Sequence, residues 1–283
     1  MDGTAVAPAA GTVLNALATG TGSAFAIDVE LRAEVTLDGR ETVTGSVAGE
    51  PDADTSLIER CVELVTERFG NGEGGTVHTE SDIPMASGLK SSSAAANATV
   101  LATLSALDAV GEISKADAAR IGVQAARDVG VTVTGAFDDA SASMLGGVTV
   151  TDNTEDALLA HDPVEWDVLV WTPPERAYSA DADVDRCHQI APMADLVADL
   201  ALDGEYGRAM TVNGLAFAAA LGFSTDPMVE AMPYVEGVSL SGTGPSVTAV
   251  GNREDLERVR ATWEQREGQT WMTTTQRDGA RTT

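Results

Sequence analysis

The chain contains very little lysine and cysteine for its length, and it has no long uninterrupted hydrophobic run. Among 283 residues, of which 17 are basic, the only lysines are Lys90 and Lys115, and the only cysteines are Cys61 and Cys187. Two cysteines without metal-ligand spacing exclude a disulfide framework, so we expect inert buried thiols. The short, glycine-interrupted apolar runs exclude a membrane-spanning helix, and no signal-peptide pattern is recognisable, so we expect a cytoplasmic protein.

Negative charge dominates the composition: 44 acidic residues give a formal net charge of −27 at pH 7. Such a surface repels nucleic acids and anionic membranes, which excludes both as partners. The acids are scattered along the chain rather than gathered in a tail, and this favours adaptation to molar salt over binding of a cationic partner. At ~1 M salt the electrostatic screening length is only about 3 Å, so self-repulsion is largely suppressed.

The hydrophobic pattern switches between strand and helix periods, which predicts a mixed α+β architecture with an early antiparallel hairpin. We interpret the acidic stretch 152–161 as the junction between a domain of residues 1–152 and a domain of residues 153–283. Helices are predicted over 55–69, 94–107, 115–129, 185–202, 206–221 and 254–267. Strands are predicted over 29–37, 42–47, 76–80, 146–151, 166–172, 238–240, 247–250 and 270–274.

The segment 84–96, with sequence PMASGLKSSSAAA, is the most informative part of the chain. A glycine permits close backbone approach to a ligand, and serines suit the unpaired N–H groups at the start of a helix. Those groups and the positive end of the helix dipole favour phosphate binding, and Lys90 adds a full positive charge. We interpret the segment as a nucleotide-phosphate cradle; the alternative is a capped loop without a ligand. It is not a P-loop, because Leu89 rather than glycine precedes Lys90.

A second segment, 132–141, places Asp138 and Asp139 among small and apolar residues. A carboxylate in such surroundings could orient or deprotonate a hydroxyl, or bind a metal. The alternative is that an aspartate merely caps a helix over 139–144.

The third segment, 241–246, is rich in glycine and could turn its amides toward an anion, but it could equally be a hairpin turn. The N-terminal run 11–28 is rich in small residues that suit either a pocket wall or a closely packed sheet. The three histidines form no metal-binding set, so no role is assigned to them.

Taken in order, the segments 84–96, 135–140 and 241–246 resemble the motifs of the GHMP kinases. More narrowly, the chain is similar to the archaeal shikimate kinase branch over nearly its whole length. This resemblance implies an N-terminal, ATP-binding domain of the ribosomal-S5 type and a C-terminal ferredoxin-like domain. It also implies the cofactors ATP and Mg²⁺ and transfer of a phosphoryl group to the 3-hydroxyl of shikimate, on the way to chorismate and the aromatic amino acids. A monomer and a homodimer are both compatible with it.

The resemblance implies roles for individual residues. Asp138 falls at the position of the catalytic aspartate, with Asp139 as its neighbour, and Lys90 would assist by neutralising phosphate charge. Ser92 falls at the metal-binding serine, and Asp128 is our choice for the acidic metal partner. The nucleotide would be held by Ala86, Ser87, Gly88, Leu89, Lys90, Ser91, Ser92, Ser93, Ala94, Ala95 and Ala96, and by Gly242, Thr243 and Gly244.

The sequence departs from the family pattern at two positions. Thr21 stands where many relatives have a lysine, and Lys90 stands where relatives often have a small residue. We therefore expect Lys90 to replace part of the missing positive charge. Two other functions are compatible with the same segments: another GHMP kinase, of the homoserine or mevalonate type, and a GHMP-fold sensor that binds sugar and ATP without catalysis. Retention of Asp138 and Ser92 argues against the sensor.

Overall fold

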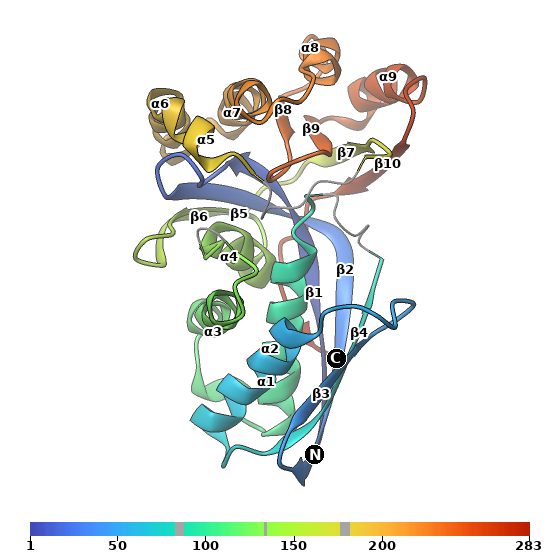
Figure 1. Cartoon of the computed structure of the whole chain (residues 1–283). Helices are drawn as coiled ribbons and strands as arrows, with labels where there is room; N and C mark the ends of the chain where they lie inside the picture. The colour runs from blue at the N-terminus through green and yellow to red at the C-terminus, as the bar shows by residue number, and fades with distance from the viewer. Residues whose placement is uncertain (83–87, 133–134, 176–181) are drawn as a thin grey trace.

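The computed structural model describes residues 1–82, 88–132, 135–175 and 182–283. Two long antiparallel strands, β1 (Asp2–Leu14) and β2 (Thr21–Arg40), form the centre of its larger sheet (Figure 1). Besides β1, strand β2 has two further partners: its first part pairs with β5 and its later part pairs with β4. The N-terminal run of small residues is therefore part of a closely packed sheet. The other strands of this sheet are β3 (Val43–Val47), β4 (Gly74–Ser81), β5 (Val148–Asp152), β6 (Ala157–Asp162) and β11 (Arg281–Thr282).

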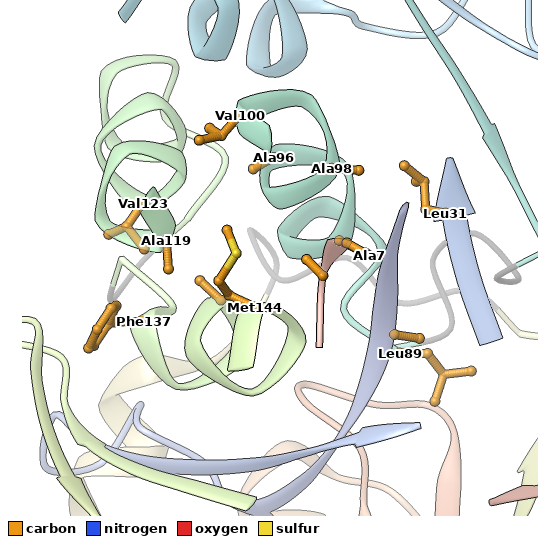
Figure 2. Packing of buried hydrophobic residues seen from close by; sticks show 14 of the residues in the cluster. Ala7, Leu31, Leu89, Ala96, Ala98, Val100, Ala119, Val123, Phe137 and Met144 are labelled. Carbon is orange, nitrogen blue, oxygen red and sulfur yellow. The ribbon is translucent and has the colours of Figure 1, made fainter. Parts of the chain in front are cut away.

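Helix α2 (Ser91–Ala106) lies against β1 and β2 and is flanked by the other helices of this half (Figure 1). It is buried almost all round, and the buried side chains are mostly small, including polar ones such as Asn97 and Thr99, as suits a helix between a sheet and other helices. Alanines such as Ala96 and Ala98 let the neighbouring elements approach it closely (Figure 2). The flanking helices are α1 (Ser56–Phe69), α3 (Lys115–Asp128) and α4 (Phe137–Leu145), with the short 3-10 helix η1 (Val110–Glu112) between α2 and α3.

The smaller sheet has the spatial order β10-β7-β9-β8, with every neighbouring pair antiparallel. In chain order these strands are fourth, first, third and second, with helices after the first and the third, which is the ferredoxin-like arrangement. The strands are β7 (Asp167–Thr172), β8 (Gly237–Leu240), β9 (Val247–Gly251) and β10 (Gln269–Thr274). The helices are α5 (Val184–Gln189), α6 (Ala191–Leu202), α7 (Tyr206–Leu221), α8 (Asp226–Ala231) and α9 (Arg253–Trp263). The two sheets with their helices confirm the predicted α+β fold of the GHMP kinase type.

Two segments connect the sheets, one between β6 and β7 and the other between β10 and β11, and they lie side by side. The backbone N–H of Trp166 donates to Thr275 Oγ1 at 3.0 Å, and the N–H of Thr275 donates to the Trp166 carbonyl at 3.0 Å. Thr275 Oγ1 also donates to the carbonyl of Val164 at 3.1 Å. The two crossings therefore form one hydrogen-bonded ribbon.

The structure contains elements that the sequence pattern did not predict, namely β1, the first part of β2, β6, α8 and β11. The stretch 152–161 contains the edge strand β6, so strand pairing in the larger sheet continues to Asp162 and later takes in β11. The helix predicted over 185–202 is two helices that meet at Ile190, because Pro192 in the first turn of α6 has no N–H to continue a helix from α5. Among the described residues, no helix is long and apolar enough to cross a bilayer.

Candidate active site

The start of α2 carries a residue in an unusual backbone conformation. Lys90 has φ 64° and ψ 32°, the left-handed region, which costs a non-glycine residue about 1 kcal/mol or more. Its neighbour Leu89 holds it in place: the Leu89 side chain is 1% exposed in the core (Figure 2), and its carbonyl accepts from Ala10 N–H at 3.3 Å. The strained residue is thus fixed by packing rather than by its own preference.

The first N–H groups of α2 have no hydrogen-bond partner within the helix. The ladder begins where Ala94 N–H donates to the Lys90 carbonyl, so Ser91, Ser92 and Ser93 precede its first donor. No side chain among the described residues caps this helix start. Ser92 is exposed and Ser93 is buried, so Ser92 is the hydroxyl available to a ligand. Unpaired N–H groups at a dipole's positive end are what phosphate binding requires.

The glycine-rich segment 241–246 lies directly against this loop. Ser241 Oγ donates to the Gly88 carbonyl at 2.9 Å, across 153 residues of sequence. Gly88 has φ 79°, and a Cβ there would lie 2.3 Å from the Ser241 carbonyl oxygen, so no other residue fits. Gly242 is held to β1 by Thr12 Oγ1, which accepts from its N–H at 2.8 Å. The segment is thus more than a local turn, because it is bonded to both the loop and the larger sheet.

Lys90 reaches from this loop to the start of α4. Its Nζ lies 2.9 Å from Asp139 Oδ1, and the two side chains are only 11% and 12% exposed. The contact is an ion pair by distance, although its angles are not those of a hydrogen bond. A Cβ on Gly242 would lie 3.0 Å from the same Nζ. One ammonium group therefore lies beside all three segments that the sequence singled out.

Asp138 is buried in a separate hydrogen-bonded position on the other side of the same turn. Its Oδ1 accepts from Asn153 Nδ2 at 2.7 Å, and its backbone N–H donates to Asn153 Oδ1 at 3.1 Å. Gly22 of β2 lies against it, since a Cβ there would be 2.6 Å from the Asp138 carboxylate. Asp138 thus has a fixed orientation, whereas Asp139 is the carboxylate that contacts the phosphate loop.

The electrostatic surroundings of the two carboxylates are unequal. Burial raises the pKa of Asp139 well above its usual range, and the neighbouring charge of Asp138 raises it further, while Lys90 lowers it. A carboxyl group with a raised pKa is suited to accept a proton near neutral pH. The candidate site therefore combines an ammonium group, a carboxyl group with a raised pKa and a helix start without a described side-chain cap.

Neither aspartate caps α4. The helix begins at Phe137, and the residue at its N-cap is Ala136, which has φ 51° and makes no capping bond through its side chain. Asp138 and Asp139 follow in the first turn, where their charges complement the helix dipole. The buried side chain of Phe137 anchors this helix start as Leu89 anchors the other (Figure 2). The capping alternative is therefore wrong for both residues.

Asp128 lies at the last residue of α3 and already has partners. Its carboxylate accepts from Arg60 Nε at 2.8 Å and from Gln124 Nε2 at 3.2 Å. The Arg60 guanidinium holds the pKa of Asp128 below its usual range. No group of three or more His, Cys, Asp or Glu side chains suited to a metal ion occurs in the described residues. Of the two residues predicted to bind Mg²⁺, Ser92 is exposed, whereas Asp128 would have to leave Arg60 to bind the ion.

Most of the sequence-predicted site residues converge. Gly88, Leu89 and Lys90 meet Gly242 of the glycine-rich segment, and Asp139 meets Lys90. Ala94, Ala95 and Ala96 continue α2 behind the loop, and Thr243 and Gly244 follow Gly242. Ala86 and Ser87 lie outside the described residues. The sequence did not single out Asn153, since an asparagine after a strand belongs to no recognisable pattern; its only signal was polarity next to the acidic stretch.

Comparison with known proteins agrees with these features. Residues 56–147 match the family of GHMP kinases N terminal domains. The chain is 64% identical, over the full length of both proteins, to a shikimate kinase of Halobacterium salinarum. It is 52% identical to a shikimate kinase of Methanosarcina acetivorans, across 93% of this chain and 90% of that protein.

The fold is also found in a solved structure of low sequence identity. Homoserine kinase from Cytophaga hutchinsonii superposes with a TM-score of 0.77 at 17% identity, over 100% of this chain and 97% of that one. This likeness concerns the fold, whereas the full-length identity of 64% concerns the family. The chain belongs to the GHMP kinases and, within them, to the archaeal shikimate kinases.

Proposed function

We propose that the chain transfers the γ-phosphoryl group of ATP to the 3-hydroxyl of shikimate, in the cytoplasm, on the way to chorismate and the aromatic amino acids. The observation that carries the proposal is the full-length identity of 64% with a protein named shikimate kinase. The convergence of Gly88, Lys90, Asp139 and Gly242 supports it independently, because phosphoryl transfer needs positioning and positive charge more than covalent chemistry.

The bonding changes assign each group a task. The acceptor oxygen forms a bond to the γ-phosphorus, the bond from that phosphorus to the β–γ bridging oxygen breaks, and ADP leaves. The first N–H groups of α2 would hold the phosphate oxygens, with Lys90 and the Gly242–Gly244 backbone closing the same end. The hydroxyl proton would pass to a carboxylate of α4.

The sequence favoured Asp138 as that carboxylate, and the contacts favour Asp139. Asp138 is bonded to Asn153, while Asp139 faces the ammonium group of the phosphate loop. We therefore assign the orientation and late deprotonation of the hydroxyl to Asp139, with Asp138 as the fixed anion beside it. Lys90 stands in for the lysine that relatives carry at the position of Thr21, because it supplies the positive charge near this carboxylate.

The metal assignment follows from exposure. Ser92 would ligate Mg²⁺ together with the triphosphate, and Asp128 would join through its carboxylate on leaving Arg60. A magnesium ion bound there would supply additional positive charge between the β- and γ-phosphates.

A coupled ADP-release assay at high KCl tests the proposal, with shikimate, homoserine and mevalonate offered separately. We expect release that depends on shikimate. Release with homoserine or mevalonate alone would make the chain another small-molecule kinase of this fold. ATP binding without release for any alcohol would instead favour the non-catalytic sensor.

A further inference from the structure

A buried asparagine outside the family motifs holds one of the two site carboxylates. Asn153 follows β5 and is 2% exposed. Its Nδ2 donates to Asp138 Oδ1 at 2.7 Å, and its Oδ1 accepts from the Asp138 backbone N–H at 3.1 Å. Because the Asp138 carboxylate accepts and the Asp138 backbone N–H donates, the Asn153 amide can have its nitrogen and oxygen only in these positions.

The asparagine is itself held from three sides. Thr151 Oγ1 donates to Asn153 Oδ1 at 2.7 Å, and the Asn153 N–H donates to the carbonyl of Gly20 at 2.9 Å. Its carbonyl accepts from Arg127 Nη2 at 3.2 Å. These bonds fix the position of Asn153. Its side chain therefore links β5 and the loop of residues 15–20 to the first turn of α4.

We propose that Asn153 is a positioning residue for the phosphoryl transfer, which fixes Asp138 as an oriented anion and thereby sets the place and proton affinity of Asp139. The inference rests on the proposed function, because it concerns the carboxylate that receives the hydroxyl proton. Asn153 acts through Asp138, to which both ends of its amide are hydrogen-bonded.

Two charged groups lie beside the Asp139 carboxylate. They are Lys90, at the start of α2, and Asp138, which precedes Asp139 in α4. Loss of the Asn153 amide releases the Asp138 carboxylate from its fixed place, so the negative charge that raises the pKa of Asp139 can approach it more closely. Asp139 would then keep its proton to higher pH, and fewer molecules would hold a carboxylate ready to accept one.

Three variants test this. In N153A the amide is lost; in N153D the volume is nearly kept, but a carboxylate replaces the donor. Thr154→Val is the control, because Thr154 is the exposed neighbour of Asn153, and loss of its 2.6 Å hydrogen bond to Asp152 Oδ1 leaves the bond between Asn153 and Asp138 in place. Steady-state kinetics at high KCl would be recorded from acid to alkaline pH, with circular dichroism to confirm folding.

In N153A and N153D we expect kcat to fall on the order of 10²-fold with KM for ATP unchanged, since a small displacement of a reacting group has this effect. The acid limb of the kcat profile should move to higher pH in N153A, and T154V should show neither change. If N153A does not fold, N153D alone decides. Equal losses in N153D and T154V, or a folded Asn153 variant with wild-type kcat and profile, would overturn the proposal. If the wild-type enzyme uses another alcohol, the proposed function fails, and the same comparison is made with that alcohol.

Discussion

Two ion pairs of nearly equal length lie in very different surroundings. Lys90 and Asp139 are 2.9 Å apart with side chains 11% and 12% exposed. On α9, Arg258 and Glu254 are 2.8 Å apart with side chains 56% and 83% exposed. Exposed pairs contribute at most about 1 kcal/mol, whereas breaking a buried pair leaves an uncompensated charge. The distance between the charged atoms therefore does not distinguish the pair at the candidate site from a surface pair, whereas the burial of the side chains does.

The α9 pair belongs to a solvated surface network of the kind a strongly acidic chain carries. Arg258 also lies 3.2 Å from Asp255, and Arg260 lies 2.7 Å from Glu264. Around Lys90, by contrast, one cation and two carboxylates are buried, and Asp138 is hydrogen-bonded to Asn153. Burying charges is costly for folding, and groups with perturbed pKa values cluster at functional sites.

The largest effect is expected from removing the site carboxylates. D139N should lower kcat by roughly 10²- to 10⁴-fold, the range of a lost general base, with little change in ATP binding. D138N should lower it less, because Asp138 acts as the neighbouring anion. Parallel ADP-release assays measure both. A larger loss in D138N would return the proton-accepting role to Asp138, and a loss below tenfold in both would contradict a role for either.

Removing the cation should have a smaller effect. K90A should lower kcat by about tenfold or more, which corresponds to about 1.4 kcal/mol of barrier, because the phosphates and Asp139 lose a partner. K115A is the matched control: Lys115, the other lysine, donates to the Asp278 carbonyl at 2.7 Å, away from these segments. Wild-type kinetics of K90A in high KCl would make Lys90 an ordinary loop residue.

The raised pKa of Asp139 predicts a pH dependence of stability. Between the ordinary pKa of an aspartate and the raised one, the folded protein holds a proton that the unfolded chain has released. The free energy of unfolding therefore falls as the pH rises through this window. D139N lacks the group, so its free energy of unfolding should fall less over the same range. Urea unfolding at several pH values in high KCl measures this; identical slopes for both proteins would contradict the raised pKa.

The smallest effect is expected at the exposed pair. R258A should change the free energy of unfolding by no more than about 0.5 kcal/mol, and by less still in high salt. Urea unfolding at low and high KCl would show this directly. A loss comparable to that of a buried pair would break the contrast between the two regions.

The hydrophobic periodicity of the sequence was sufficient to predict helices that have one apolar face. The helices predicted over 55–69, 115–129 and 206–221 match α1, α3 and α7 to within one residue. It failed for β1 and the first part of β2, where small residues on both faces remove the alternation that marks a strand. It also failed for β6, whose edge position leaves the adjacent Leu158 and Leu159 both exposed, so no buried face alternates with an exposed one.

The site was predictable as segments but not as contacts. The prediction of phosphate binding at 84–96 depends only on residues close together in the sequence, at the start of a helix. The pairing of Lys90 with Asp139, 49 positions later, depends on how α2 and α4 pack, and no local pattern contains that information. The choice between Asp138 and Asp139 likewise depends on Asn153, a tertiary contact.

The ribbon at Trp166 and Thr275 limits how the smaller sheet can move. The ribbon does not act alone, because Asn15 Nδ2 donates to the Gly242 carbonyl at 2.9 Å and the Gly242 N–H donates to Thr12 Oγ1 at 2.8 Å. Separating Ser241 from Gly88 would therefore break these bonds as well as the bond from Ser241 Oγ to the Gly88 carbonyl. The position of Gly242 beside Lys90 is thus set by several hydrogen bonds at once.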